Sequence, residues 1–440
     1  MCYNCLMEEK MPKNIVILGG GYGGIRTALD VGRFLKNNDT TAHNWTLHII
    51  DKSDSHVFTP NLYEMATVLK EDASAWNIKK AVALEFSEIF TGLPIHYKQD
   101  VVLEIDTKNK KIVLRDGQPL NYEILVLALG CETNFFNIEG LEGNSSSLKT
   151  VEHAVIIRNA INTIISSQNT GQEAHIAIGG GGPTGVELAG ELTRFIHKKC
   201  SFKENKNCRK IKITIFEAGD TILNGLPSAT INSVRYRLNK LGVNIKEKTS
   251  ILKAEKEFLY IKNPDQQEEK VFCDLLIWAG GTKISPLLEA IVAPKDKKGR
   301  CLVESSLEVK LQSTDSNTNP QHIYAIGDLI CFTDTRTGKP LPGTAYIAIE
   351  EGKVVAKNII GKISKSENNK ISYSAPKFYP FAIPLGGKYA IFSFGSISMS
   401  GFWGWLVRIF IDLRYFLSIL PPHKAVPFWI KSVLLMIKND

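Results

Sequence analysis

The chain has 440 residues, of which 44% are hydrophobic and 22% are charged. At roughly 100 to 200 residues per domain, this length predicts about two to four domains, and the composition excludes a largely disordered protein. The formal net charge of +8 is compatible with an acidic ligand or an anionic membrane surface. No basic stretch interleaved with aromatic residues and no zinc-finger spacing is present, so a nucleic-acid partner is not expected.

The eight cysteines are scattered through a long chain, which argues against a disulfide framework. Cys2 and Cys5 form a C-x-x-C pair in a segment with no predicted fold of its own, so a redox or metal role is the less favoured interpretation. We predict no metal site. The start of the chain lacks a positively charged region followed by an apolar core, so we predict no secretory signal and a cytoplasmic protein.

The first strong pattern is a strand, a glycine turn, a helix and a second strand that ends in an acid. The apolar run 15–18 leads into the glycine-rich turn 19–24, a helical pattern follows through Phe34, and the next apolar run, 47–50, ends at Asp51. This order is typical of a dinucleotide-binding unit.

Each glycine of this turn has a separate expected role. Gly19 permits the sharp turn, Gly21 lets the backbone approach a pyrophosphate, and Gly24 lets helix and strand pack closely. The phosphates would bind N–H groups at the start of the helix, and Asp51 would accept hydrogen bonds from a ribose. The residues predicted to bind the first dinucleotide are Gly19, Gly21, Tyr22, Gly23, Gly24 and Asp51.

Short strands are predicted next, over residues 100–105, 111–114 and 122–129. The last of them is apolar throughout and is expected to be buried on both faces. It ends at Gly130, where the backbone can approach a cofactor.

The opening unit is then repeated. The apolar run 175–178 enters a second glycine turn and a helix, and the strand 213–216 ends at Glu217. Two such units in one chain are more specific than either alone, and they predict two bound dinucleotides. The residues predicted to bind the second are Gly180, Gly182, Pro183, Thr184, Gly185 and Glu217.

The acid at the second strand end favours NADH over NADPH, because a 2'-phosphate would be repelled by Glu217. Lys210 or Lys212 could soften this repulsion. The polar stretch 197–212, which contains Cys200 and Cys208, is predicted to be a solvated surface loop.

Two further strands end in small residues. The strand at 275–278 leads to Gly280, another predicted cofactor contact. The strand 323–326 is followed by Gly327 and Asp328, and in a flavoprotein a carboxylate at that position suits the ribityl chain.

With these motifs, the chain resembles the type II NADH dehydrogenases, which are single-chain NADH:quinone oxidoreductases of the two-dinucleotide, FAD-dependent pyridine nucleotide-disulfide oxidoreductase superfamily. The strongest matches are at residues 19–24, 58–66, 180–192, 278–281 and 325–328. The resemblance implies an α/β fold with two Rossmann-like domains, the first binding FAD and the second NADH, followed by a C-terminal membrane-associating segment with amphipathic helices.

The resemblance also implies roles for individual residues. Asp51 would bind the adenosine ribose of FAD, Asp328 would lie near its ribityl chain, and Glu217 would bind the ribose of NADH. Glu187 matches the acid that lies beside the nicotinamide in this family. A carboxylate in the first turn also stabilises its own helix, so Glu187 has a structural interpretation as well.

The expected domain boundaries follow the motifs. We predict an N-terminal extension over 1–10, the FAD-binding domain over 11–150 and 285–385, the NADH-binding domain over 151–284, and a membrane-anchoring region over 386–440.

The chain departs from its relatives in two places. The helix of the first unit holds no redox cysteine pair, so electrons would pass from NADH through FAD to an acceptor that is not a protein disulfide. Tyr346 and Glu350 stand where the family usually has the glutamines of Ala-Gln-x-Ala-x-Gln, near the flavin and the quinone. We predict catalytic roles for Glu187, Tyr346 and Glu350, in reduction of a membrane quinone of a respiratory chain without proton pumping.

Two alternatives remain open. Sulfide:quinone oxidoreductases share the architecture and need cysteines near the flavin, and Cys131 and Cys331 follow motifs expected there. Both are also explained as small buried residues, and the second glycine unit with Glu217 favours NADH over sulfide as the donor. The second alternative is a flavin- and NADH-binding sensor with slow turnover.

The C-terminal part is predicted to contain strands and two amphipathic helices. Residues 393–398 alternate with period two, a helix is predicted from Gly401 to the Pro421-Pro422 pair, and a second over 426–437. Lysines at 424, 431 and 438 share one face of the second helix. The pattern favours a peripheral anchor on the cytoplasmic face of the cell membrane. A dimer interface or a tail packed on the core is the alternative, and a homodimer is compatible with the anchor.

Overall fold

The computed structural model describes residues 12–38, 43–68, 75–167, 173–202, 209–311, 322–364 and 370–439. The predicted extension 1–10, with Cys2 and Cys5, lies outside these residues, as does Cys208. The chain divides into two compact units, each made of three segments. Unit 1 comprises Met1–His56, Glu85–Glu132 and Ile284–Lys377, and unit 2 comprises Val57–Leu84, Thr133–Lys283 and Phe378–Asp440.

These divisions differ from the predicted domain boundaries. Residues 57–84, 133–150 and 378–385, which were assigned to the FAD-binding domain, group with the second dinucleotide motif, and so does the predicted anchoring region 386–440. The predicted assignment of the segments to an FAD domain, an NADH domain and an anchor therefore stays a prediction about function.

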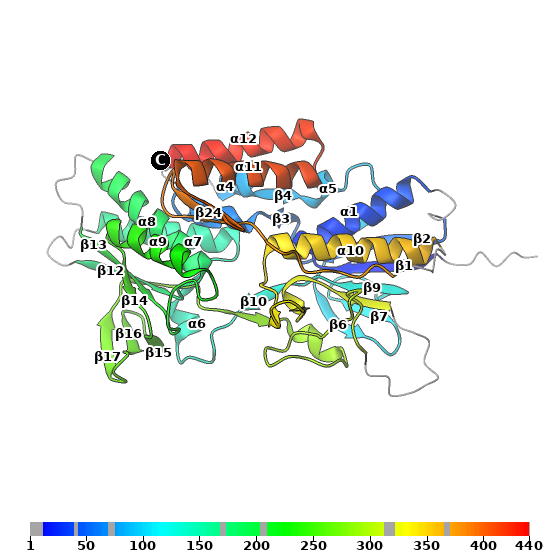
Figure 1. The fold of residues 1–440 in the computed structure, drawn as a ribbon, viewed down its shortest axis with the longest axis horizontal. Helices are drawn as coiled ribbons and strands as arrows, with labels where there is room; N and C mark the ends of the chain where they lie inside the picture. The colour runs from blue at the N-terminus through cyan, green and yellow to red at the C-terminus, as the bar shows by residue number, and fades with distance from the viewer. Residues whose placement is uncertain are drawn as a thin grey trace, which may run out of the picture. The chain divides into compact units, whose positions relative to one another are not determined.

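Unit 1 is built on a five-stranded parallel sheet in the order β20-β9-β1-β2-β5. The central strand β1 (Lys13–Leu18) places residues 15–18 at 0% exposure, as expected for an apolar strand covered on both faces. Helix α1 (Tyr22–Lys36) runs beside α10 (Ala345–Ile363), as Figure 1 shows.

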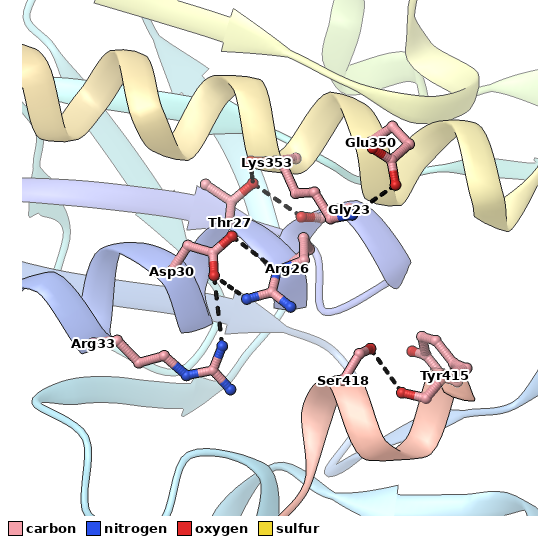
Figure 2. Close-up of polar contacts among 10 residues, drawn as sticks. Gly23, Arg26, Thr27, Asp30, Arg33, Glu350, Lys353, Tyr415 and Ser418 are labelled. Carbon is pink, nitrogen blue, oxygen red and sulfur yellow. Dashed lines mark hydrogen bonds and ion pairs between the residues drawn. The ribbon is translucent and has the colours of Figure 1, made fainter. Parts of the chain in front are cut away.

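The crossing of α1 and α10 is unusually close. A Cβ on Gly352 would lie 2.6 Å from the carbonyl oxygen of Gly23, so only glycine fits. The hydroxyl of Thr27 donates to the carbonyls of Gly23 (2.9 Å) and Gly352 (3.2 Å). The start of α1 is thereby fixed against α10. Along α1, Asp30 forms ion pairs with the buried Arg26 and with Arg33 (Figure 2).

The other strands and helices of unit 1 are β2 (Trp45–Asp51), α5 (Phe86–Ile89), β5 (Ile95–Gln99), β6 (Val102–Asp106), β7 (Lys111–Leu114), β8 (Leu120–Asn121), β9 (Ile124–Leu127), η2 (Pro286–Ala290), β20 (His322–Ala325), η3 (Gly327–Leu329), β21 (Thr333–Asp334) and β22 (Lys339–Pro340). Four strands lie at or beside the unit boundaries: β3 (Ser55–Val57), β4 (Ala83–Glu85), β10 (Cys131–Thr133) and β19 (Thr282–Ile284).

Unit 2 repeats the parallel sheet, in the order β11-β18-β12-β13-β14. Its central strand β12 (Ala174–Gly179) leads into α8 (Pro183–Phe202), and β13 (Ile211–Phe216) ends before Glu217. Helix α8 continues through residues 197–202, so the prediction of a surface loop from His197 was wrong over these positions. The prediction failed because a run of polar residues is typical of a loop but also occurs at the solvent-facing end of a long helix such as α8.

The C-terminal part of unit 2 has the predicted strands and helices. Strands β23 (Phe381–Pro384), β24 (Ala390–Phe394) and β25 (Ile397–Gly401) form an antiparallel sheet against which α11 (Phe402–Ile419) packs. Helix α12 (Pro422–Asn439) lies beside α11 (Figure 1) and begins four residues before the predicted start. No helix among the described residues is long and apolar enough to cross a membrane.

The remaining elements of unit 2 are η1 (Thr59–Asn61), α3 (Leu62–Ala66), α4 (Ala75–Val82), α6 (Leu141–Asn144), β11 (Ser146–Ser147), α7 (Val151–Ser166), α9 (Ser228–Lys240), β14 (Asn244–Lys246), β15 (Ser250–Ala254), β16 (Phe258–Lys262), β17 (Glu268–Phe272) and β18 (Leu275–Trp278).

Candidate active site

The glycine turn of unit 1 has the geometry of a phosphate cradle. Gly19 adopts φ +105°, which disfavours any side chain. A Cβ on Gly24 would lie 2.0 Å from the carbonyl oxygen of Gly19, whereas a Cβ on Gly21 would meet nothing within 4 Å. Gly19 and Gly24 are therefore required by the fold. Gly21 faces open space, as expected where a ligand approaches the backbone.

Unit 2 reproduces this geometry. Gly180 adopts φ +110°, and a Cβ on Gly185 would lie 2.1 Å from its carbonyl oxygen. A Cβ on Gly182 would meet nothing within 4 Å. The same division into two glycines required by packing and one that faces open space occurs in both units, which supports a shared role.

Each strand-end acid holds its own glycine turn. Asp51 accepts hydrogen bonds from the backbone N–H of Gly20 (2.7 Å) and of Ser53 (2.8 Å). Glu217 accepts from Gly181 (2.6 Å) and Gly219 (2.6 Å). A carboxylate oxygen can accept more than one hydrogen bond, so both acids retain capacity for a ribose hydroxyl.

The starts of both helices suit an anion. Helix α1 begins after Gly21 with no side-chain cap and no acid in its first turn, and α8 has no acid in its first turn either. Pro183 and Thr184, at the start of α8, are exposed. The backbone N–H groups and the helix dipole can therefore act on a phosphate. The residues present fit two dinucleotides.

His56 supports the first turn and was missed in the sequence. Its Nδ1 lies 3.2 Å from the carbonyl oxygen of Gly20, and its ring packs edge-on against Tyr22 at 4.9 Å. Burial lowers the pKa of His56 to about 4, so the ring is neutral at pH 7. A single histidine in a loop gave no signal of this contact.

Lys210 and Lys212, which were expected to soften the charge of Glu217, do not lie beside it. Lys212 lies at the opposite end of β13 from Glu217, and Lys210 precedes that strand, so neither softens the charge of the acid. The backbone N–H of Glu217 instead donates to the carbonyl of Lys246 (2.9 Å), at the end of β14. Lys248 follows and pairs with Asp220 at 3.6 Å.

Asp328 follows β20 on a turn in which Gly327 adopts φ +70°. The thiol of Cys131 donates to Oδ2 of Asp328 at 2.9 Å. A Cβ on Gly343 would lie 2.2 Å from Oδ1, so the carboxylate is closely enclosed on that side. Cys331 lies near Asp328 in the sequence but accepts from Arg300 at 3.5 Å. Neither cysteine forms a disulfide bond.

The two residues that replace the family glutamines lie on the first turns of α10. Tyr346 and Glu350 are both partly exposed, and Glu350 is paired with Lys353 at 2.6 Å (Figure 2). The pairing explains how a carboxylate is tolerated there. The next residue, Glu351, was not predicted: it is 1% exposed and accepts from the backbone N–H of Gly327 at 2.7 Å. Burial raises the pKa of Glu351 to about 8.

Glu187 lies one turn into α8, in unit 2. Its side chain is partly exposed, yet desolvation raises its pKa to about 8, an effect that the positive charge of Arg408 reduces. With this pKa, Glu187 can gain or lose a proton close to neutral pH, which suits a group that exchanges a proton during a reaction.

Arg408 is a buried cation on the largely apolar helix α11. It is 4% exposed, donates to Oδ1 of Asn61 at 2.6 Å and lies 5.6 Å from the ring centroid of Tyr63. One turn later, Asp412 is 6% exposed, and burial raises its pKa to about 6 against the influence of Arg408. Opposite charges four residues apart in a largely apolar helix, as at Arg408 and Asp412, indicate a buried electrostatic interaction that the apolar periodicity alone does not predict.

The predicted site residues therefore divide between the units. Unit 1 holds Gly19, Gly21, Tyr22, Gly23, Gly24, Asp51, Gly130, Asp328, Tyr346 and Glu350; unit 2 holds Gly180, Gly182, Pro183, Thr184, Gly185, Glu187, Glu217 and Gly280. Gly130 adopts φ +66° with open space at its Cβ position. Gly280 instead lies against the indole of Trp278, where a Cβ would approach within 2.6 Å. No group of three or more possible metal ligands occurs among the described residues.

Curated relatives match most of the chain. Demethylphylloquinone reductase NdbB of Synechocystis is 29% identical over 359 residues, which are 80% of each chain. The type II NADH:quinone oxidoreductase of Staphylococcus saprophyticus is 28% identical over 82% of this chain and 85% of its own.

The fold matches a solved structure as well. NDH2 from Plasmodium falciparum, in complex with NADH, superposes with a TM-score of 0.80 at 19% identity, covering 96% of this chain and 97% of that one. The profile of the Pyridine nucleotide-disulphide oxidoreductase family matches residues 13–352. With its two glycine turns and their acids, the chain belongs to the pyridine nucleotide-disulphide oxidoreductase family.

Proposed function

We propose that the protein is an FAD-dependent NADH:quinone oxidoreductase. The observation that carries the proposal is the presence of two complete dinucleotide-binding turns, one in each unit, each with a strand-end acid on its own glycine loop. Relatives that align over four fifths of the chain are a quinone reductase and a type II NADH:quinone oxidoreductase by name.

FAD is assigned to unit 1 and NADH to unit 2. In unit 1, the N–H groups at the start of α1 would bind the FAD pyrophosphate, Asp51 the adenosine ribose, and Asp328 the ribityl chain. In unit 2, the start of α8 would bind the NADH pyrophosphate and Glu217 its ribose. The negative charge of Glu217 at the ribose position would repel the 2'-phosphate of NADPH, which favours NADH.

Bound FAD supplies the chemistry that the side chains lack, because it accepts a hydride from NADH and passes electrons to a quinone. The protein contributes binding, orientation and protons. Quinone reduction consumes two protons, and Glu187, with its pKa of about 8, can hold one at neutral pH. Tyr346 and Glu350 would take the polar contacts that glutamines make in relatives.

The C-terminal helices support a peripheral association with a membrane. Apolar side chains on α11 and α12 remain exposed, at 36% to 66% of their surface. They are Phe402, Trp403, Phe410, Ile411, Leu417, Val426, Ile430, Leu434 and Ile437. Lys431 is exposed among them. Such a surface suits the interface of a bilayer that holds the quinone, on its cytoplasmic face.

The first test is NADH oxidation by the FAD-loaded protein in lipid, with and without quinone. Rapid NADH consumption only in the presence of quinone supports the proposal. If NADH reduces the flavin and quinone does not reoxidise it, the alternative of a slow redox sensor is favoured. Sulfide as a parallel donor tests the remaining alternative, for which Cys131 is positioned against Asp328.

The membrane assignment has its own test. Flotation with anionic vesicles should recover the protein, and replacement of Trp403 and Phe410 by glutamate should abolish flotation. If the double variant instead converts a dimer into a monomer and floats as before, this surface is a homodimer interface. The exposed Tyr236, on α9 of the same unit, provides a matched control as Tyr236→Glu.

A further inference from the structure

Glu351 occupies a point where three parts of unit 1 meet. Its carboxylate Oε2 accepts from the N–H of Gly327, the first residue of the turn that carries Asp328. The adjacent Gly352 packs on Gly23 at the start of α1. A Cβ on Gly23 would also lie 2.7 Å from the side chain of Ile326, directly before the turn. Glu351 is therefore linked to the Asp328 turn by its own hydrogen bond and to the glycine turn through the packing of Gly352.

Cys131 restrains the same turn from another strand. Its thiol donates to Oδ2 of Asp328. Cys131 is the first residue of β10 and follows Gly130, which adopts φ +66°. Asp328 is thus held through its backbone turn by Glu351 and through its carboxylate by Cys131. Neither residue belongs to the glycine motif or to the strand-end acids.

We propose that Glu351 is a positioning residue for FAD: as a neutral acid, it holds the turn that presents Asp328 to the cofactor, while Cys131 orients the Asp328 carboxylate. The proposal rests on the assignment of Asp328 to the FAD site and not on the identity of the electron acceptor.

The charges around Glu351 explain why the neutral form is required. Asp328, on the turn, adds a negative charge that together with burial raises the pKa of Glu351, and the Gly327 N–H only partly opposes them. On α10, Lys353 is paired with Glu350. On α1, Arg26 is paired with Asp30.

Two weakly acidic side chains lie near the Glu351–Asp328 pair, Tyr373 near Glu351 and Cys131 against Asp328. The buried hydroxyl of Tyr373, in the segment after α10, has no hydrogen-bond partner among the described residues. Cys131, on β10, already donates to Asp328. Ionised Glu351 would therefore lie beside the carboxylate of Asp328, while Lys353 and Arg26 are each paired with another acid. Repulsion between the two carboxylates would displace the Asp328 turn.

The test is the pH dependence of FAD affinity, measured by titrating FAD-free protein with FAD in the absence of NADH and quinone. With a pKa of about 8, ionised Glu351 exceeds the neutral form by about tenfold at pH 9, so affinity should be up to about tenfold lower at pH 9 than at pH 7. Glu351→Gln keeps an acceptor for Gly327 and cannot ionise. It should bind FAD as the wild type does at pH 7 and lose no affinity at pH 9.

Further variants separate positioning from folding. Glu104→Gln removes an exposed carboxylate of the same unit and should retain the wild-type pH profile. Cys131→Ser keeps a donor and should bind FAD more tightly than Cys131→Ala, with circular dichroism confirming that each variant is folded. A Glu351→Gln profile that still falls between pH 7 and 9 would overturn the proposal. So would an Asp328→Ala variant that binds FAD as tightly as the wild type.

Discussion

Alanine substitutions at Gly21 and Gly24 should have opposite consequences, although the two residues are three positions apart in one turn. Gly24 packs against the carbonyl oxygen of Gly19, 2.0 Å from where a Cβ would lie. Gly21 has open space around its Cβ position and adopts φ −76°, ψ −170°, which alanine accepts without strain. One glycine is required by the protein and the other only by its ligand.

The magnitudes follow from these surroundings. Gly24→Ala forces backbone atoms apart, and overpacking of this kind destabilises by about 1 to 3 kcal/mol. Gly21→Ala should stabilise the FAD-free protein by about 0.4 to 1 kcal/mol, because alanine restricts the unfolded chain. The added methyl would occupy the space of the pyrophosphate, so FAD affinity should fall by at least about tenfold, or about 1.4 kcal/mol.

The assay pairs urea unfolding of the FAD-free variants with FAD titration. Gly21→Ala should unfold at a higher urea concentration than the wild type and bind FAD poorly. Gly24→Ala should unfold at a lower one. The reasoning is refuted if Gly21→Ala retains wild-type FAD affinity, since no ligand backbone would then approach that position.

Three further outcomes are expected. Glu217→Arg should weaken NADH more than NADPH in steady-state kinetics, and unchanged selectivity would contradict the placement of Glu217 on the ribose. The stability that Glu187 contributes while protonated is lost as pH rises from its ordinary pKa of 4.5 through about 8, so Glu187→Gln should raise the melting temperature relative to wild type more at pH 8.5 than at pH 5. Arg408→Met should destabilise by about 1 to 3 kcal/mol, because it leaves the buried oxygen of Asn61 without its donor, and it should raise the pKa of buried Asp412 further. Asp412→Asn in the same chain should recover part of that loss, and strictly additive effects in the double variant would show that the two side chains do not interact.

The two dinucleotide units could be predicted because their signals are local. A buried parallel strand, a glycine turn and an amphipathic helix each leave a short pattern, and the acids Asp51 and Glu217 stand at the strand ends themselves. The family match supports that interpretation over residues 13–352.

The supporting residues could not be predicted, since each depends on a partner far away in the sequence. Glu351 is an ordinary helical glutamate until β20 brings Gly327 to it. Arg408 donates a hydrogen bond to Asn61, which lies 347 positions earlier in the chain. The hydrophobic periodicity of the sequence assigns such residues to one face of a helix but does not predict which residues pack against that face.

The contact between α1 and α10 has a consequence for how the protein is made. The hydroxyl of Thr27 reaches the carbonyl of Gly352, which is 325 positions later in the chain. At about 5 to 20 residues per second, a ribosome needs on the order of 15 to 65 s between these two points. During that interval α1 lacks the helix that covers it, and the sheet of unit 1 lacks its edge strand β20. The long middle segment of unit 2, in contrast, has its central strands synthesised close together. Unit 2 should therefore begin to fold on the ribosome before α10 has been synthesised and can pack against the FAD-binding turn. A nascent chain halted before β20 should be unable to retain FAD.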